Sequence, residues 1–342
     1  MKAAYLRAHG GPEVVTVGEL PDPSPGPGEV RVAVRAAAVN HLDLWVRRGW
    51  PGLLLSFPHV LGSDMAGVVD AVGAGVAEPK VGDAVVVNPT SSCGRCPRCL
   101  SGAENLCRRF SILGEHTSGG QAEWVVVPAR NTVPKPAHLS FEEAASVPVT
   151  WVTAWRALVG RAKVRLGETV LVHAAGSGVG VAAVQIAKLL GARVIATAGS
   201  EAKLEKARAL GADEVVNYEA GSFVEAVKKL TQRRGVDVVL EHVGQKTWEG
   251  SILSAAIGGR IVTVGATTGH EAKTDLRHVF YRQLSILGST MGTAADLVEV
   301  LRLLDEGKLR TVIDRTLPLG EVRRAHDLLA ERAQFGKIVL TI

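Results

Sequence analysis

Long hydrophobic runs are absent from this sequence of 342 residues. No segment approaches the roughly 20 consecutive apolar residues that a membrane-spanning helix requires. The N-terminal segment also lacks the roughly 7–15-residue apolar stretch of a secretory signal peptide. We therefore expect a cytoplasmic protein that does not insert into membranes.

A strong excess of one charge is missing as well. The chain has 39 basic and 34 acidic residues, a formal net charge of +5, and the basic residues are spread along it. Proteins that bind nucleic acids usually gather such residues into a patch or stripe. We therefore expect a small-molecule substrate and no nucleic acid. The composition is otherwise that of an ordinary globular protein, and the length favours two domains.

Cysteine is absent outside one short segment, where four residues follow the spacing C-x2-C-x2-C-x7-C. Four thiolates on a tight loop can surround Zn²⁺ tetrahedrally and leave no open position, which is the arrangement of a structural site. Disulfides and an iron–sulfur cluster are the alternatives, but clustered cysteines in a cytosolic enzyme favour zinc. We expect one structural zinc per chain, bound by Cys93, Cys96, Cys99 and Cys107.

The two halves of the chain differ in pattern. Up to about residue 145 the segments are short, rich in β-forming residues and interrupted by Gly and Pro. Residues 29–35 alternate between apolar and charged side chains, which is typical of a half-buried strand. We expect the first half to be an antiparallel, barrel-like domain.

After residue 167, short apolar strands alternate with segments of helix length. Such alternation predicts a parallel sheet that is covered by helices on both faces. Gly191 and Gly211 stand where a helix should end and a strand begin. A helix at 294–304 and a strand at 337–342 should return to the first half. The predicted strands of the parallel sheet are 169–174, 193–198, 214–217, 236–241, 260–265 and 284–289.

A glycine-rich segment follows the first of these strands and leads into a helix expected at 181–190. Small residues at such a turn let the backbone approach a pyrophosphate, whose charge interacts with the N-terminal end of the helix. A tight structural turn is the alternative, but the strand–turn–helix context favours dinucleotide binding. The residues expected to contact the cofactor here are Ala175, Gly176, Ser177, Gly178, Val179 and Gly180.

The end of the second strand bears on the choice of cofactor. NAD(H) sites usually carry Asp or Glu there to bind the ribose hydroxyls, whereas this chain has Ala198, Gly199 and Ser200. Ser200 can donate a hydrogen bond, and Lys203 follows one turn into the next helix. We therefore expect NADP(H) to be preferred over NAD(H), although Lys203 could also be an ordinary exposed lysine.

Several stretches together resemble the zinc-containing alcohol dehydrogenase and quinone oxidoreductase family of medium-chain dehydrogenases. They include residues 27–30, 58–69, 81–83, the cysteine segment, 119–127, the glycine-rich turn and 336–339. The resemblance implies an α/β protein with a GroES-like catalytic domain (1–148, with a zinc lobe at about 90–110). It further implies a Rossmann NADP-binding domain (149–290) and a C-terminal segment (291–342) that returns to the catalytic domain.

The same resemblance implies further properties. Hydride is expected to move in a cleft between the two domains, and the protein should form a homodimer or homotetramer. Tyr218 matches a residue that family members place near the adenosine. Val243, Gly265 and Lys337 are added to the expected cofactor-binding residues.

The chain departs from the family where a catalytic zinc would bind. Members with that zinc carry Cys-His-x-Asp where this sequence has Asn40-His41-Leu42-Asp43, and Gly-His-Glu where it has Gly62-Ser63-Asp64. A third ligand expected near Thr150 is missing too. Amides and hydroxyls are poor zinc ligands. We expect the catalytic zinc to be absent, as in the quinone oxidoreductase branch.

Hydride transfer to a quinone or enone builds negative charge on a carbonyl oxygen, which hydrogen-bond donors must then stabilise. Asn40, His41 and Thr153 are the candidate donors, and Asp43 could orient its neighbours. Asn40 could instead hold the local loop, and His41 could contact the pyrophosphate.

Two other functions remain open. One is an alcohol dehydrogenase with an atypical zinc site built from His41, His59, Asp43 or Asp64. The other is a non-catalytic NADPH-binding structural protein, because a Rossmann fold implies cofactor binding but not turnover. Without a second zinc, His59 should be structural.

Overall fold

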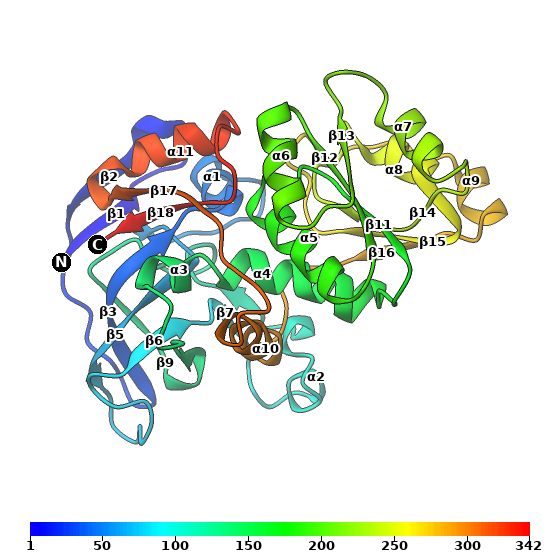
Figure 1. The fold of residues 1–342 in the computed structure, drawn as a ribbon. Coiled ribbons are helices and arrows are strands. Elements are labelled where there is room, and N and C mark those ends of the chain that lie inside the picture. Colours follow the sequence, from blue (N-terminus) through cyan, green and yellow to red (C-terminus); the bar gives the residue numbers. More distant parts are fainter. The chain divides into compact units, whose positions relative to one another are not determined.

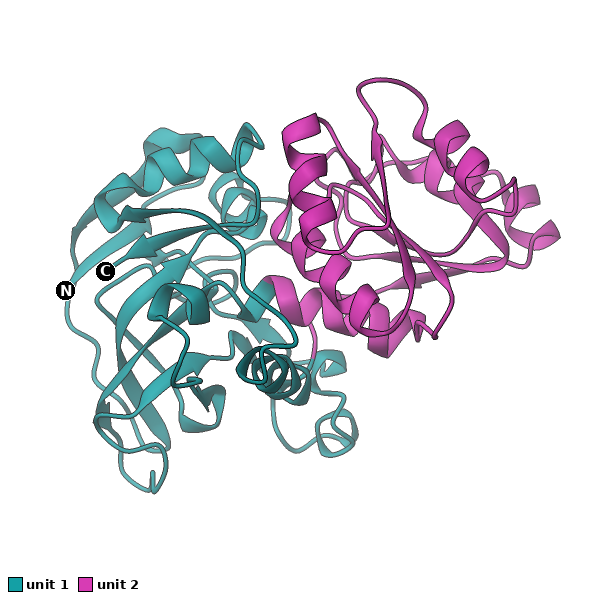
Figure 2. Cartoon of the chain, in the orientation of Figure 1, with its two compact units in different colours: residues 1–149, 293–342 teal, residues 150–292 magenta.

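The computed structural model describes residues 1–342 and divides them into two compact units (Figure 2). Unit 1 combines Met1–Val149 with Thr293–Ile342, and unit 2 is the continuous segment Thr150–Gly292. The chain passes from the first unit to the second within α4 (Pro148–Trp155). The last 50 residues therefore belong to the same unit as the N-terminal half.

Unit 1 is built on a seven-stranded sheet centred on β3 (Glu29–Ala38) and β5 (Asp64–Val72), which pair antiparallel (Figure 1). The alternation predicted for residues 29–35 places Val30, Val32 and Val34 in the core. The other strands of this sheet are β6 (Ala84–Val87), β9 (Trp124–Pro128), β10 (Thr132–Pro134), β17 (Ile313–Pro318) and β18 (Lys337–Thr341). A smaller sheet contains β1 (Lys2–Leu6), β2 (Val15–Glu19) and β4 (His59–Val60), and β7 (Thr90–Ser91) pairs with β8 (Ser111–Ile112).

The C-terminal strand β18 lies inside the large sheet. It pairs antiparallel with β3 on one side and parallel with β17 on the other. The helices of unit 1 are α1 (His41–Arg48), α2 (Pro97–Leu100), α3 (Phe141–Ala145), α10 (Ala294–Asp305) and α11 (Val322–Ala330). The predicted return of the C-terminal segment thus takes the form of strand insertion.

Unit 2 contains a six-stranded sheet in the order β13-β12-β11-β14-β15-β16, with every pair parallel. The predicted α/β fold with a parallel sheet is confirmed. Prediction and structure agree on the bounds of β12 (Arg193–Ala198), β13 (Glu214–Asn217) and β14 (Val236–Glu241). The remaining strands are β11 (Thr169–Val172), β15 (Ala255–Thr263) and β16 (Ser285–Gly288).

Helices connect these strands (Figure 1). The α-helices are α5 (Gly178–Leu189), α6 (Glu201–Ala209), α7 (Phe223–Leu230), α8 (Trp248–Ser254) and α9 (Leu276–Tyr281). A π-helix at Arg156–Ala162 precedes the first strand. Gly191 and Gly211 follow α5 and α6 with φ of 74° and 107°, as a left-handed helix end requires. β11 ends two residues earlier than predicted because the chain turns at Ala174, where φ is 43°. No helix is long and apolar enough to cross a membrane.

Candidate functional site

The four cysteines converge in the cysteine lobe, defined as residues 90–110. Their Sγ atoms all lie within 4.8 Å of one another. The Sγ atoms of Cys96 and Cys99 are 3.5 Å apart, those of Cys93 and Cys99 3.8 Å, and those of Cys96 and Cys107 3.9 Å. Tetrahedral coordination with Zn–S bonds of about 2.3 Å separates sulfurs by about 3.8 Å. The free thiols of the lobe therefore fit a structural zinc.

Local backbone geometry favours the thiolate form of Cys93. N–H groups of Arg95 and Cys96 point at the sulfur of Cys93 and lower its pKa to about 6. A thiolate is the form that binds zinc. Gly94 adopts a φ of 70° between the first two ligands, and α2 begins directly after Cys96. A short helical turn at Glu104–Leu106 then brings Cys107 back to the other three.

A buried ionic cluster occupies the region of unit 1 where the sequence departs from zinc-dependent relatives. The carboxylate of Asp64 accepts hydrogen bonds from the Asn40 side-chain amide at 2.9 Å and from Nζ of Lys337 at 2.8 Å. Its other oxygen accepts from the backbone N–H of Val149 at 2.7 Å. Lys337 also donates to the carbonyl oxygen of Val39 at 3.0 Å and to Oδ1 of Asn40 at 2.6 Å. Lys337 thus has no fourth N–H for the predicted contact with a cofactor.

Asp43 holds the start of α1 in place. Its carboxylate accepts hydrogen bonds from the backbone N–H groups of Asn40 at 2.7 Å and of Gly62 at 3.2 Å. The side chain is fully buried, and burial raises the pKa of Asp43 to about 7. The contacts agree with an orienting role, because Asp43 joins the first residues of α1 to the loop before Ser63.

The residues of the atypical zinc hypothesis do not gather into a ligand set. Among groups of three or more His, Cys, Asp and Glu side chains, the cysteine lobe alone has ligand atoms in metal-binding range. The ring of His59 hydrogen-bonds to the carbonyl oxygen of Gly114 at 3.1 Å, and Ser63 donates to that of Leu113 at 2.6 Å. His41 begins α1, where its ring contacts that of Trp45. The contacts of His59 are those of a structural residue.

The glycine-rich turn of unit 2 packs closely against the start of its own helix. Ser177 caps α5 by accepting a hydrogen bond from the N–H of Gly180 at 2.9 Å. A Cβ atom on Gly180 would lie 2.4 Å from the carbonyl oxygen of Ala174, so this position excludes a side chain. The helix actually begins at Gly178, three residues before the predicted start. The N-terminal end of this helix is suited to hold a phosphate.

The second strand ends beside Tyr218. A Cβ on Gly199 would lie 3.0 Å from the phenolic oxygen of Tyr218, so any larger residue there would push the ring outward. Ser200 occupies the N-cap position of α6 without a side-chain capping hydrogen bond, and Lys203 lies half-buried on the first turn of that helix. The sequence argument overlooked Glu201, which begins α6 and accepts a hydrogen bond from the Asn217 side chain at 2.9 Å. A carboxylate therefore lies one residue after the segment 198–200, in which NAD(H) sites usually carry theirs.

Of the remaining predicted residues of unit 2, two lie on loops after strands and one lies on a helix. Val243 follows β14, with its N–H donating to Glu241 at 2.8 Å, and Gly265 follows β15. Thr153 is buried on α4, and its hydroxyl contacts the sulfur of Met291 at 3.8 Å.

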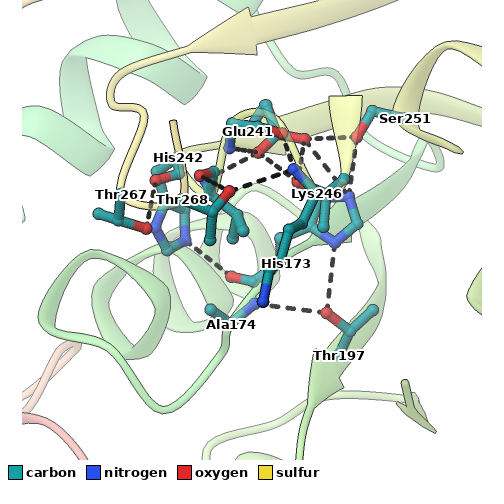
Figure 3. A network of polar contacts seen from close by, with 12 residues as sticks. His173, Ala174, Thr197, Glu241, His242, Lys246, Ser251, Thr267 and Thr268 are labelled. Carbon is teal, nitrogen blue, oxygen red and sulfur yellow. Dashed lines mark hydrogen bonds and ion pairs between the residues drawn. The ribbon is translucent and has the colours of Figure 1, made fainter. Parts of the chain in front are cut away.

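Sequence reasoning missed a buried polar network at the carboxyl ends of β11 and β14 (Figure 3). His173, Glu241 and Ser251 lie in it with almost no exposed surface. The sequence did contain a signal. Two short apolar runs, 170–172 and 238–240, are each followed directly by a titratable residue, His173 after the first and Glu241 after the second.

Comparison with known proteins identifies relatives over the whole chain. Residues 26–137 match the alcohol dehydrogenase GroES-like domain, and residues 178–306 match the zinc-binding dehydrogenase family. The chain is 34% identical to an acryloyl-coenzyme A reductase of Metallosphaera sedula, over 100% of both chains. It is 31% identical to a quinone oxidoreductase of Rattus norvegicus, over 100% of this chain and 98% of the other.

Solved structures agree with this assignment. One that is described as an NAD-dependent alcohol dehydrogenase is 56% identical and superimposes with a TM-score of 0.97 over 100% of both chains. The likeness covers the β-rich catalytic unit, the parallel sheet and the cysteine lobe together. The chain is therefore an oxidoreductase of the medium-chain dehydrogenase superfamily, in the alcohol dehydrogenase and quinone oxidoreductase family.

Proposed function

We propose that the protein transfers hydride between NADP(H) and a quinone, an enone or another conjugated carbonyl compound, without a catalytic zinc. The observation that carries this proposal is the ionic cluster of Asn40, Asp64 and Lys337. Asp64 offers its carboxylate to a lysine and an amide, and Asn40 and Ser63 replace the thiolate and imidazole of zinc-dependent relatives. A residue set of this kind is suited to hydrogen bonding rather than to holding Zn²⁺.

The chemistry needs donors near the oxygen that gains charge. Hydride delivered to the β-carbon of an enone moves electrons onto the carbonyl oxygen, and aimed N–H or O–H groups stabilise that charge. The Asn40 amide uses one N–H for Asp64 and has a second to offer. Asn40, His41 and Thr153 are the proposed donors, while Asp43 keeps the start of α1 in position. The zinc of the cysteine lobe would contribute stability and take no part in catalysis.

The preference for NADP(H) is the finer part of the proposal. It is supported by the lack of a carboxylate at the end of β12 and by Lys203 on the first turn of α6. Glu201 opposes it, because a carboxylate can bind ribose hydroxyls and repel a 2′-phosphate. The relative that is described as NAD-dependent makes NAD(H) the competing assignment.

A substrate screen tests the reaction itself. The absorbance of NADPH and of NADH would be followed with quinones, enones, an acryloyl thioester, aldehydes and alcohols, and zinc per chain would be determined in the same preparation. Turnover of a conjugated carbonyl at one zinc per chain is expected. Oxidation of alcohols alone, with two zincs per chain, would instead establish the alcohol dehydrogenase alternative. Tight cofactor binding without turnover of any compound would favour a non-catalytic protein.

We also propose that the protein assembles as a homodimer or homotetramer through unit 2. Support comes from β16, an edge strand of the parallel sheet, and from exposed apolar side chains nearby in the chain. Ile257, Phe280 and Tyr281 are exposed by 75%, 63% and 78%. Light scattering coupled to size-exclusion chromatography would measure the mass, and a monomer would contradict the assembly.

A further inference from the structure

The buried polar network of unit 2 connects two loops that the proposed function assigns to the cofactor (Figure 3). Glu241 closes β14, and its side chain has no exposed surface. It accepts hydrogen bonds from the N–H groups of Val243 at 2.8 Å and Gly244 at 3.0 Å. The Ser251 hydroxyl lies 2.5 Å from its other oxygen, and that of Thr247 lies 2.9 Å from both. The loop after β14 is thus folded around a carboxylate.

Glu241 is ionised and His173 is neutral. Burial lowers the pKa of His173 to about 4, because no solvent reaches the ring. Burial alone would raise the pKa of Glu241; a charge on His173 when that ring is protonated, the Ser251 hydroxyl and the N–H groups of Gly244 and Val243 outweigh burial and lower that pKa. A carboxylate can only accept hydrogen bonds, and a neutral imidazole donates from one nitrogen and accepts at the other.

These charge states determine which group donates in each hydrogen bond of the series that links Glu241, through Ser251 and His173, to Thr197. Ser251 must donate its hydroxyl hydrogen to Glu241. Its oxygen, 2.9 Å from Nε2 of His173, must then accept from that nitrogen. Nδ1 of His173 is therefore left as the acceptor, and Oγ1 of Thr197 lies 3.3 Å away to donate to it.

The chain of hydrogen bonds ends on the phosphate-binding turn. Oγ1 of Thr197 accepts the backbone N–H of Ala174 at 3.3 Å. Ala174 has a φ of 43°, a left-handed conformation that a residue with a Cβ adopts only when its surroundings hold it there. The carbonyl oxygen of His173 is also held, by Nε2 of His242 at 2.7 Å. Both polar groups of the peptide bond between His173 and Ala174 are thereby held, the N–H by Thr197 of β12 and the carbonyl oxygen by His242 after β14.

We infer that Glu241 is a positioning residue for the dinucleotide. Through Ser251, His173 and Thr197 it imposes one direction on a hydrogen-bond relay that holds Ala174, and with it the turn from Ala175 to Gly180, in the shape that receives the diphosphate. The same carboxylate shapes the loop that carries Val243. This inference rests on the proposed binding of a nicotinamide cofactor at these two loops.

Two serines of α8 provide a matched test. Ser251 and Ser254 are both fully buried, but the hydroxyl of Ser254 has no hydrogen-bond partner, so Ser254→Ala makes the same chemical change outside the relay. Binding of NADPH and NADH would be titrated in the full-length variants, with melting temperatures recorded in parallel. Ser251→Ala should weaken both cofactors by about tenfold, because both carry the diphosphate, while Ser254→Ala should change them by less than about twofold.

The tautomer of His173 gives a second measurement that does not need the cofactor. Nitrogen NMR of histidine-labelled protein, with His173→Gln to assign the signals, should find the proton on Nε2 in the wild type. Glu241→Gln presents an amide that can donate to Ser251, so the proton should move to Nδ1. A wild-type proton on Nδ1, or no change in Glu241→Gln, would overturn the relay.

The outcomes separate the relay from the proposed function. If the wild type binds neither cofactor, the proposed function fails and the positioning role fails with it. If the wild type binds but the two serine variants weaken binding equally, in parallel with their loss of stability, the relay alone is overturned. Selective weakening in Ser251→Ala, together with the expected tautomer, supports it.

Discussion

The two units of this protein neutralise buried negative charge by different means. In unit 1, Asp64 pairs with the ammonium group of Lys337 at 2.8 Å, and the four thiols of the cysteine lobe are arranged for a divalent cation. In unit 2, Glu241 is equally buried but is surrounded by backbone N–H groups and hydroxyls instead of a cation. The glycine-rich turn of the same unit likewise offers N–H groups to an anion.

The difference matters for how each unit tolerates change. A full charge that loses its counter-ion in the interior leaves the partner unpaired, at a large energetic penalty. A carboxylate held by several dipoles loses only a part of its stabilisation when one donor is removed. Unit 1 should therefore respond to single substitutions more strongly than unit 2 does.

The largest effect is expected at the cysteine lobe. Cys96→Ser removes one of four soft ligands, so zinc per chain should fall from one toward zero, and the lobe should lose its folded form because metal binding and local folding are coupled. Elemental analysis and thermal unfolding would measure both. Cofactor binding should persist, since the glycine-rich turn belongs to the other unit. Protein prepared without chelators that contains no zinc, or two per chain, would contradict the one-site assignment.

The second largest effect is expected at the ionic cluster. Lys337→Met leaves Asp64 buried without its cation and should lower the free energy of unfolding by about 3–5 kcal/mol. Urea denaturation would measure it. Adding Asp64→Asn removes the stranded charge, so the double variant should recover part of the loss. Additive losses would mean that the two side chains are not coupled.

The variant Lys203→Ala tests whether unit 2 also stabilises a negative charge with a cation. The cation is the ammonium group of Lys203, and the negative charge is the 2′-phosphate of bound NADPH. A charge-assisted hydrogen bond to the 2′-phosphate contributes roughly 1.5–3 kcal/mol, so NADPH should bind tenfold to a hundredfold more weakly. NADH, which lacks that phosphate, should bind as before. Titration of both cofactors decides the matter: equal weakening, or a wild-type preference for NADH, would refute the proposed cofactor preference.

Glu241→Gln should have a smaller effect on stability than Lys337→Met. The amide oxygen of the new Gln side chain still accepts from the N–H groups of Val243 and Gly244. Its NH₂ group, however, takes the place of the oxygen that accepts from the Ser251 and Thr247 hydroxyls in the wild type. A loss of about 1–3 kcal/mol in the free energy of unfolding is expected. The two variants would be denatured under identical conditions, and a larger loss for Glu241→Gln would reverse the contrast between the units.

The most gradual effect is a pH dependence from His173. Its pKa is lowered to about 4 in the folded protein, whereas an unfolded histidine titrates near 6.5. The unfolded state therefore binds more protons between these values, and stability falls as the pH drops through this window. The slope from one such group is at most about 1.4 kcal/mol per pH unit. His173→Gln should make the measured slope shallower, and an unchanged slope would exclude this cause.

Local patterns predicted those parts of the molecule in which sequence neighbours act together. Short apolar runs between segments of helix length gave the bounds of β12, β13 and β14, and the spacing of the cysteines gave their convergence. The glycine-rich turn was predicted because a strand, a turn and a helix are consecutive in the chain.

No local sequence pattern predicted the contacts between residues that are far apart in the chain. Lys337 meets Asp64 across 273 positions, so a lysine in a C-terminal strand gave no hint of its buried partner. Glu241 and His173 are 68 residues apart by number and meet because β11 and β14 are neighbours in the sheet. Glu201 was overlooked because it lies one residue beyond the segment in which NAD(H) sites usually carry their carboxylate.

The insertion of β18 between β3 and β17 determines when unit 1 can form during synthesis. Unit 2 is one continuous segment and can fold as soon as residue 292 has left the ribosome. The sheet of unit 1 has to wait for residues 337–341, because β9 pairs only with Glu29–Ala33 of β3 and leaves Ala36–Ala38 of that strand without their partner. Exposed strand edges invite wrong pairing. We therefore expect chains stalled before residue 337 to be protease-sensitive in unit 1 and resistant in unit 2.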